Sequence, residues 1–165
     1  MPNRSRSSPP HAVAPVESPS LLRELARTRA AYLSLQSAYT YGSILLHRDL
    51  PGVARMLGFA AKTTGEDALA LGLLLCEQGT SHAVNTTLRD IPYRLLTDAD
   101  SHAPVVALRL INDRIRDEKS RLLHNKALQK RAVTEAVHRT LSRHIQTAEE
   151  RIAHLEEAAR LLSVS

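Results

Sequence analysis

The chain has 165 residues, a formal net charge of +5 and a hydrophobic content of 43%, with aromatic residues at only 3%. This length supports one domain with a hydrophobic core, and the dominance of Leu and Ala favours an all-α fold over sheets. The longest apolar run, 68–76, is roughly half of the ~18 residues that a membrane span needs. With a single cysteine and no secretory segment, we expect a cytoplasmic protein without membrane contact.

The first segment, 1–19, is predicted to be a disordered tail because it is rich in Ser, Pro and Arg and has few apolar anchors. Arg4 and Arg6 precede any acidic residue, so organellar targeting by the tail stays open as an alternative. The prolines of this segment oppose the amphipathic helix that such targeting requires.

A four-helix bundle is predicted over 20–165, with helices at about 20–47, 51–78, 103–126 and 132–162. The first helix begins after Ser18 and Pro19, a capping residue followed by a proline in the first turn. Its inward residues alternate in steps of four and three, which is typical of a bundle helix. They are Leu21, Leu25, Thr28, Tyr32, Leu35, Tyr39, Gly42 and Leu46.

The second helix is predicted to begin at Pro51 and to end at Gly79, a residue suited to the C-terminal end of a helix. Its inward residues are Val53, Leu57, Ala60, Thr64, Asp67, Leu71 and Leu74. Beyond Ala68 the helix is apolar on nearly every side. We therefore expect it to be covered on more than one side, either at the centre of the bundle or by another subunit.

The second half of the chain is predicted to supply two more helices after a connection over 79–103 that crosses the length of the bundle. The third helix is expected to break near 124–130, and its inward residues are Leu108, Ile111, Ile115, Glu118 and Leu122. The inward residues of the fourth helix are predicted as Thr134, His138, Leu141, Ile145, Ala148, Ile152, Leu155, Ala159 and Leu162.

Several short motifs occur in the order in which ferritins carry them. These are Tyr39-x-Tyr41-x-Ser43, Arg48-Asp49, Phe59-Ala60, 77–80 at a helix end, and 89–92 in a long loop. Over about 30–95 the chain therefore resembles the ferritin family. The resemblance implies a ferritin-like four-helix bundle of two antiparallel hairpins joined by a long crossover loop, without the fifth C-terminal helix.

The same resemblance implies a degenerate ferroxidase centre. Ferritin subunits that oxidise iron use a Glu on the first helix and Glu-x-x-His on the second, and Ser34, Thr64 and Asp67 stand at these positions. The expected function is that of a light-chain-like subunit in iron binding, iron storage or shell structure, without ferroxidase activity of its own. The expected partners are ferritin-like subunits in a homo- or hetero-oligomer. Iron is the expected cofactor, and its di-iron site is expected to be weak or absent.

Counting residues from the helix ends places Asp67, Glu118, Tyr32 and His144 in one inner layer of the bundle. Two buried carboxylates are costly without a cation, so either a residual metal or a basic neighbour is expected there. The candidate metal ligands are Asp67, Glu118, Glu66 and His144. In the alternative, the carboxylates lie at the bundle edge and Glu118 pairs with Arg114 or Arg121 on its own helix.

A basic stretch at 109–131 holds eight Lys or Arg residues against three acidic ones. It gives a second hypothesis, a non-catalytic helical interaction module that binds an acidic partner or nucleic acid through this stretch. The other interpretation is a solvated helix face whose cations suit the C-terminal end of the helix dipole.

Overall fold

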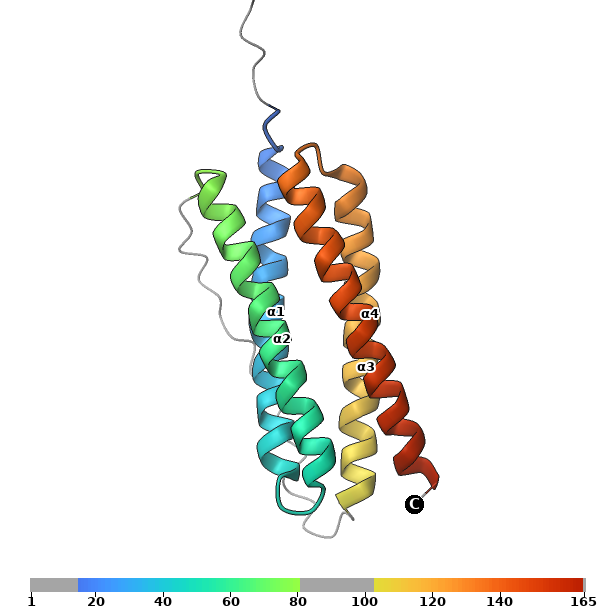
Figure 1. Cartoon of the computed structure of the whole chain (residues 1–165). Coiled ribbons are helices and arrows are strands. Elements are labelled where there is room, and N and C mark those ends of the chain that lie inside the picture. The colour runs from blue at the N-terminus through green and yellow to red at the C-terminus, as the bar shows by residue number, and fades with distance from the viewer. Residues whose placement is uncertain (1–14, 81–102, 165) are drawn as a thin grey trace, which may run out of the picture.

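Four helices make up nearly all of the part of the chain that the structure describes, residues 15–80 and 103–164 of a computed structural model. They are α1 (Pro19–Leu46), α2 (Pro51–Glu77), α3 (Ala103–Arg131) and α4 (Glu135–Val164), and the described residues contain no strand (Figure 1). The prediction of an all-α four-helix bundle is confirmed. The predicted crossover loop and most of the predicted tail lie outside the described residues.

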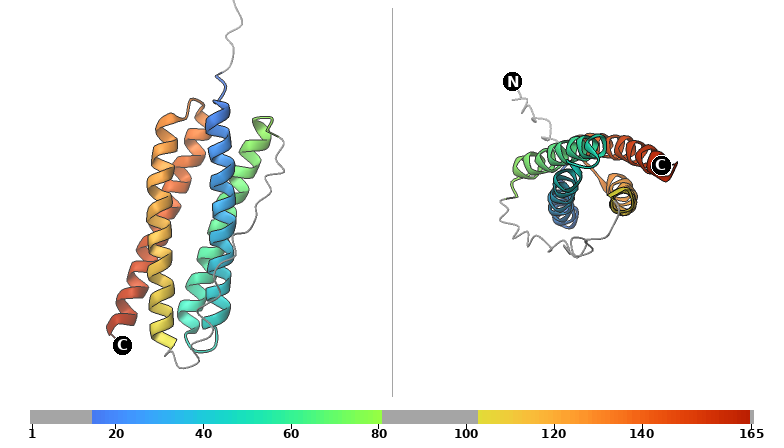
Figure 2. Two further views of the ribbon diagram at one scale, coloured as in Figure 1. Left: turned by 180° about the vertical axis from the view of Figure 1, so that it is seen from behind. Right: turned by 90° about the horizontal axis from the view of Figure 1, so that it is seen from below.

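The helices enclose one elongated core. α1 packs mainly on α2 and α3 mainly on α4, with smaller contacts between α2 and α4 and between α1 and α3. α1 and α2 run in opposite directions, as do α3 and α4, whereas α2 and α3 run in the same direction (Figures 1 and 2). None of the described helices is long and apolar enough to cross a membrane.

The first two helices, α1 and α2, begin where the sequence predicts. Ser18 Oγ accepts a hydrogen bond from Leu21 N at 3.2 Å, and Pro19 occupies the first turn of α1. Pro51 begins α2 in the same way, although no side chain caps that helix. After α2 the chain turns through Gly79, whose φ of 71° is a backbone conformation that glycine adopts without a Cβ penalty.

The third helix is longer than predicted. It continues without the expected break to Arg131, so α4 begins only at Glu135. The continuation is held in the core by two residues that the prediction left out, Asn125 and Leu128, which are 0% and 1% exposed. Burial of this last stretch, rather than helix propensity alone, keeps it helical.

The end of the predicted disordered tail is in fact anchored. Glu17 is 2% exposed, and its Oε1 accepts hydrogen bonds from Thr134 N at 2.6 Å, Thr134 Oγ1 at 2.8 Å and Val133 N at 3.0 Å. These donors lie in the turn between α3 and α4, where backbone N–H groups lack helical partners. Glu17 thus ties the start of α1 to that turn, and the prediction for 15–19 is wrong in this respect.

Close approach of α1 and α2 depends on glycines at every seventh residue of α2. A Cβ added to Gly65 would lie 2.5 Å from Nε2 of Gln36, and one added to Gly58 would lie 3.2 Å from Oγ of Ser43. The missing side chains on α2 therefore leave room for polar side chains of α1. This contact was not predicted.

The outer side of α2 is not covered within this chain, so the predicted place at the centre of the bundle is wrong, while the alternative, cover by another subunit, stays a prediction. Leu69 and Leu73 are 62% and 58% exposed, and Cys76 is exposed as well. Within this single chain, α2 is therefore buried on one side only.

Two glycine substitutions test these backbone assignments. Gly52→Ala should raise the free energy of unfolding by about 0.4–1 kcal/mol, because Gly52 is helical and an added Cβ meets nothing within 4 Å. Gly79→Ala should lower it by about 1–2 kcal/mol, because φ at this position is positive. Urea denaturation followed by circular dichroism measures both, and effects of equal sign would contradict the assignment.

Candidate functional site

A layer of buried polar side chains divides the hydrophobic core into two clusters. One cluster holds Leu21, Leu25, Leu71, Leu128 and Leu141, and the other holds Leu35, Leu57, Ile111 and Leu155. Between them all four helices contribute polar groups that are at most 4% exposed. These are Tyr32 and Tyr39 from α1, Thr64 and Asp67 from α2, Glu118 and Asn125 from α3, and His144 and Arg151 from α4.

Arg151 is the centre of this layer because its guanidinium binds carboxylates from two other helices. Its Nε donates to Glu118 Oε1 at 2.7 Å and its Nη2 to Glu118 Oε2 at 3.3 Å. Its Nη1 donates to Asp67 Oδ2 at 2.9 Å. This fork geometry is the strong form of an arginine–carboxylate contact, and here it joins α2, α3 and α4.

The two carboxylates also accept hydrogen bonds from hydroxyl groups. Tyr39 of α1 donates to Glu118 Oε1 at 2.8 Å, and Thr147 of α4 donates to Asp67 Oδ2 at 2.9 Å. Burial, followed by the neighbouring Glu118 charge, raises the pKa of the Tyr39 phenol far above its usual value, so Tyr39 remains a donor. The layer therefore connects all four helices through charge-assisted hydrogen bonds.

His144 is the one member of the layer that lacks hydrogen-bond partners. It is 0% exposed, and neither ring nitrogen has a partner among the described residues. Its Nε2 lies 3.6 Å from Asp67 Oδ1, which is too long for a hydrogen bond. Its ring meets the Tyr32 ring edge-on, with centroids 5.3 Å apart. The Tyr32 hydroxyl in turn accepts a hydrogen bond from Asn125 Nδ2 at 2.6 Å.

Burial sets the charge state of the layer. It lowers the pKa of His144 to about 4, with Arg151 and Arg143 acting in the same direction, so His144 is neutral at pH 7. Burial likewise raises the pKa of Asp67 and outweighs the opposing effect of Arg151. For Arg151, burial opposes the charged form, but the Glu118 and Asp67 carboxylates raise its pKa overall. With both acids ionised, two negative charges face one positive charge.

The structure brings together three of the four predicted site residues. Asp67, Glu118 and His144 lie in one layer with Tyr32, at the depth that residue counting gives. Glu66 is exposed on α2 and takes no part in the network. The alternative partners of Glu118, Arg114 and Arg121, do not bind it, and Arg114 instead contacts Asp117 at 3.0 Å.

Arg151 itself was missed because the predicted inward positions of α4 step from Ala148 directly to Ile152. His138 is exposed, and the buried residues of α4 are Val137, Leu141, His144, Ala148, Arg151, Ile152 and Leu155. The same alternation of four and three would have found it. The signal in the sequence was a charged residue at an inward position of an otherwise largely apolar face. Two buried carboxylates on neighbouring helices need a cation, and this was the reason to place Arg151 in the core.

The residues present do not fit a ferritin-type metal centre. Glu118 uses both carboxylate oxygens and Asp67 uses Oδ2 to bind Arg151, and a divalent cation would need the same oxygens beside a fixed positive charge. Among the described residues no three His, Cys, Asp or Glu side chains are grouped closely enough to hold a metal ion. The basic neighbour, the second of the two predicted solutions, is the one that the geometry favours.

Comparison of the chain with models of protein families, with curated proteins and with solved structures finds no match. The geometry of the layer is therefore the basis for proposing a function.

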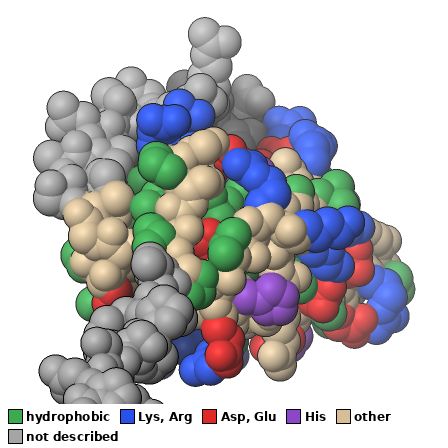
Figure 3. Space-filling view, turned by 90° about the horizontal axis from the view of Figure 1, so that it is seen from above, with side chains coloured by type: hydrophobic (Ala, Val, Ile, Leu, Met, Phe, Trp, Pro, Cys, Tyr) green, Lys and Arg blue, Asp and Glu red, His purple; other side chains and the backbone are tan. Residues whose placement is uncertain are grey.

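The basic stretch at 109–131 is largely neutralised within the bundle. Five of its eight basic side chains form ion pairs: Arg114–Asp117, Arg116–Asp113, Lys119–Glu156, Lys126–Glu149 and Arg131–Glu24. In the view from above, Lys and Arg side chains lie beside Asp and Glu side chains along the right flank (Figure 3). This pairing favours the interpretation as a solvated helix face over that as a binding surface for polyanions.

Removal of the central cation tests the network. Arg151→Met should lower the free energy of unfolding by about 3–5 kcal/mol, because it leaves two buried carboxylates without a counter-charge. Adding Asp67→Asn and Glu118→Gln should restore most of this loss, since the amides keep acceptors for Tyr39 and Thr147 without a buried charge. Arg160→Met, which removes an exposed ion pair on the same helix, is the matched control and should cost at most about 0.5 kcal/mol. A small loss in Arg151→Met, or no recovery in the triple variant, would contradict this account.

The buried His144 should make the fold sensitive to mild acid. Its pKa is about 4 in the folded state and 6.5 in the unfolded state, so between these values the unfolded chain binds more protons and stability falls as the pH falls. His144→Phe should remove a destabilisation on the order of 3 kcal/mol between pH 7 and pH 4. Asp67, whose raised pKa acts in the opposite direction, is present in both proteins and cancels in the comparison.

Thermal unfolding from pH 4 to pH 7 is the measurement, with His154→Phe, an exposed position of α4, as control. Parallel curves for wild type and His144→Phe would contradict the prediction.

Proposed function

We propose that the chain is a structural subunit of ferritin-like architecture that does not oxidise iron by itself. The observation that carries the proposal is Arg151, which binds Asp67 and Glu118 in the inner layer where the resemblance to ferritins expects the iron ligands. A guanidinium there supplies the positive charge that two buried carboxylates need. Each of the two carboxylates thus has a cationic partner that is not a metal ion.

The other positions aligned with ferritin ligands support the same proposal. Thr64 on α2 is fully buried and donates its hydroxyl hydrogen to Ala60 O at 2.7 Å, within its own helix. Ser34 on α1 does the same with Ala30 O at 3.3 Å. Neither side chain is a carboxylate, and both hydroxyl groups are used in backbone contacts. Hard carboxylate ligands for iron are therefore missing at these two positions.

Assembly with further subunits is the part of the proposal that concerns partners. The exposed Leu69 and Leu73 of α2 are large apolar side chains on one outer face, and a second subunit would remove them from water. In such an assembly the chain contributes shell structure, and any oxidation of iron belongs to partner subunits. The interaction-module hypothesis has weaker support because most cations of 109–131 are already paired.

Three measurements on the purified full chain test the proposal together: molar mass by light scattering after size-exclusion chromatography, iron per chain, and the rate of Fe²⁺ oxidation in air. We expect an oligomer whose oxidation rate equals that of buffer. Arg151→Met, with Asp67 and Glu118 released, should bind more Fe²⁺ than wild type if it remains folded. A monomer would refute the subunit role. Stoichiometric iron whose oxidation is lost in Asp67→Asn would refute the non-catalytic role.

A further inference from the structure

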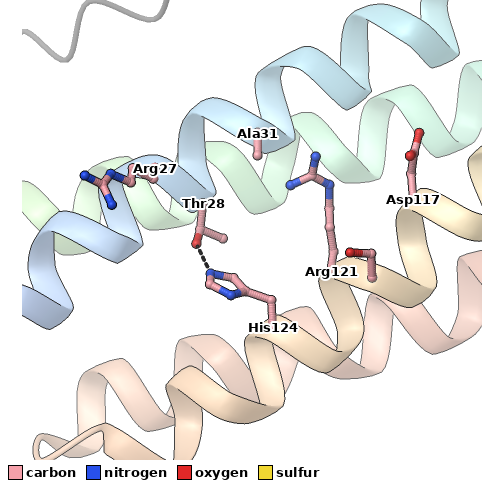
Figure 4. Close-up of a pocket in the computed structure, with 7 residues that line it drawn as sticks. Arg27, Thr28, Ala31, Asp117, Arg121 and His124 are labelled. Atoms are coloured by element: carbon pink, nitrogen blue, oxygen red, sulfur yellow. Dashed lines mark hydrogen bonds between the residues drawn. The ribbon is translucent and has the colours of Figure 1, made fainter.

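A pocket of about 340 Å³ lies between α1 and α3, on the side of the bundle where the helices pack less closely. Its polar lining comes from Arg27 and Thr28 of α1 and from Asp117, Ser120, Arg121 and His124 of α3. Arg27 lies at one end and Asp117 at the other, with Thr28, His124 and Arg121 between them, and the Arg27 side chain points away from Arg121 (Figure 4). The volume is at the lower end of the ~300–1,000 Å³ range of small-molecule sites.

Arg121 is the charged side chain of the lining whose surroundings are most unusual. The side chain extends from α3 toward α1 beside Ala31, and its buried Nε has no hydrogen-bond partner among the described residues (Figure 4). Its guanidinium carbon lies 5.8 Å from the centre of the Tyr32 ring, a cation–π contact that fixes the guanidinium without using its donors. Burial lowers the pKa of Arg121, while Tyr32, Asp117 and Glu118 act in the opposite direction. A guanidinium held in this way is ready to bind an anion.

The acidic residue of the lining does not cancel this charge. Asp117 is paired with Arg114, at 3.0 Å, and so already has its own cation. The two arginines of the lining therefore leave the pocket with a net positive charge. Ser120 adds an exposed hydroxyl group on the same turn as Arg121.

The hydrogen bonds of Thr28 fix the direction in which His124 donates. Thr28 Oγ1 gives its hydrogen to Glu24 O at 2.9 Å, so it can only accept at its contact with His124 Nε2, at 3.2 Å. Nε2 therefore carries the hydrogen and is held by Thr28. The ring is thus fixed in the middle of the pocket, between the two guanidinium groups (Figure 4).

We propose that this pocket binds the phosphate group of a small organic phosphate, with Arg121 as the main ligand and Arg27 and Ser120 as further donors. A guanidinium fork matches two phosphate oxygens. Ser120 and, after its exposed side chain turns toward the pocket, Arg27 would supply further donors. The pocket is larger than a phosphate ion requires, which leaves room for a small organic part. The site is separate from the Arg151 layer and does not depend on the proposed subunit role.

The test is titration of the full chain with inorganic phosphate and with glycerol 3-phosphate at constant ionic strength, followed by calorimetry and by NMR. We expect saturable binding with shifts confined to 27–31 and 117–124. Arg121→Gln should weaken it about tenfold or more, because a charge-assisted hydrogen bond contributes about 1.5–3 kcal/mol. Tighter binding of glycerol 3-phosphate identifies an organic phosphate, and equal affinities identify the free ion as the ligand.

Two controls keep the result decisive. Arg116→Gln removes an exposed cation of α3 that is paired with Asp113 and does not line the pocket, so it should leave binding unchanged. If Arg121→Gln unfolds, the exposed substitutions Arg27→Gln and Ser120→Ala take its place. The absence of saturable binding would overturn the proposal. So would equal losses in Arg116→Gln and the pocket variants, which would indicate general charge attraction.

Discussion

The burial of Arg151 between Asp67 and Glu118 is the constraint on which the rest of this bundle depends. Three charged side chains from three helices are at most 4% exposed, and a buried ion pair without good geometry destabilises a fold. Here each nitrogen of the guanidinium donates to a carboxylate oxygen. A shift of any one helix by a single turn, about 5.4 Å, would break these contacts. The layer therefore fixes the register of helices whose Leu and Ala surfaces would otherwise pack in several ways.

The layer also links the core to the surface pocket. Tyr32 faces His144 with one ring edge, receives a hydrogen bond from Asn125, and carries the Arg121 guanidinium over its ring. Burial, followed by the Asp67 charge, raises the pKa of Tyr32 to about 12, so its hydroxyl stays neutral beside the carboxylates. The position of Arg121 in the pocket thus depends on a residue that the polar layer holds in place.

The sequence predicts the helices facing this layer to different extents. On α1, all eight predicted inward residues are buried, because apolar and aromatic residues define one side of the helix without competition. On α2, Asp67 is buried as predicted, again from periodicity alone. On α4, the adjacent residues Arg151 and Ile152 are both buried, and hydrophobicity alone selects only Ile152. The physical reason to place Arg151 inside is the charge of Asp67 and Glu118, which lie on other helices and become neighbours only in the folded bundle.

Apart from Tyr39, which belongs to both, the ferritin resemblance and the chemistry of the layer rest on different residues, which is why one does not determine the other. The motifs that carry the resemblance, such as Arg48-Asp49 and Phe59-Ala60, lie at a helix turn or on partly exposed helix faces. The chemistry depends on inward positions such as Thr64, Asp67 and Arg151, each of which can change while a bundle of the same shape persists. A cation is required at the centre as long as Asp67 and Glu118 are buried there. An arginine from α4 meets that requirement within the chain, and so a bound metal is not required to keep the two carboxylates inside.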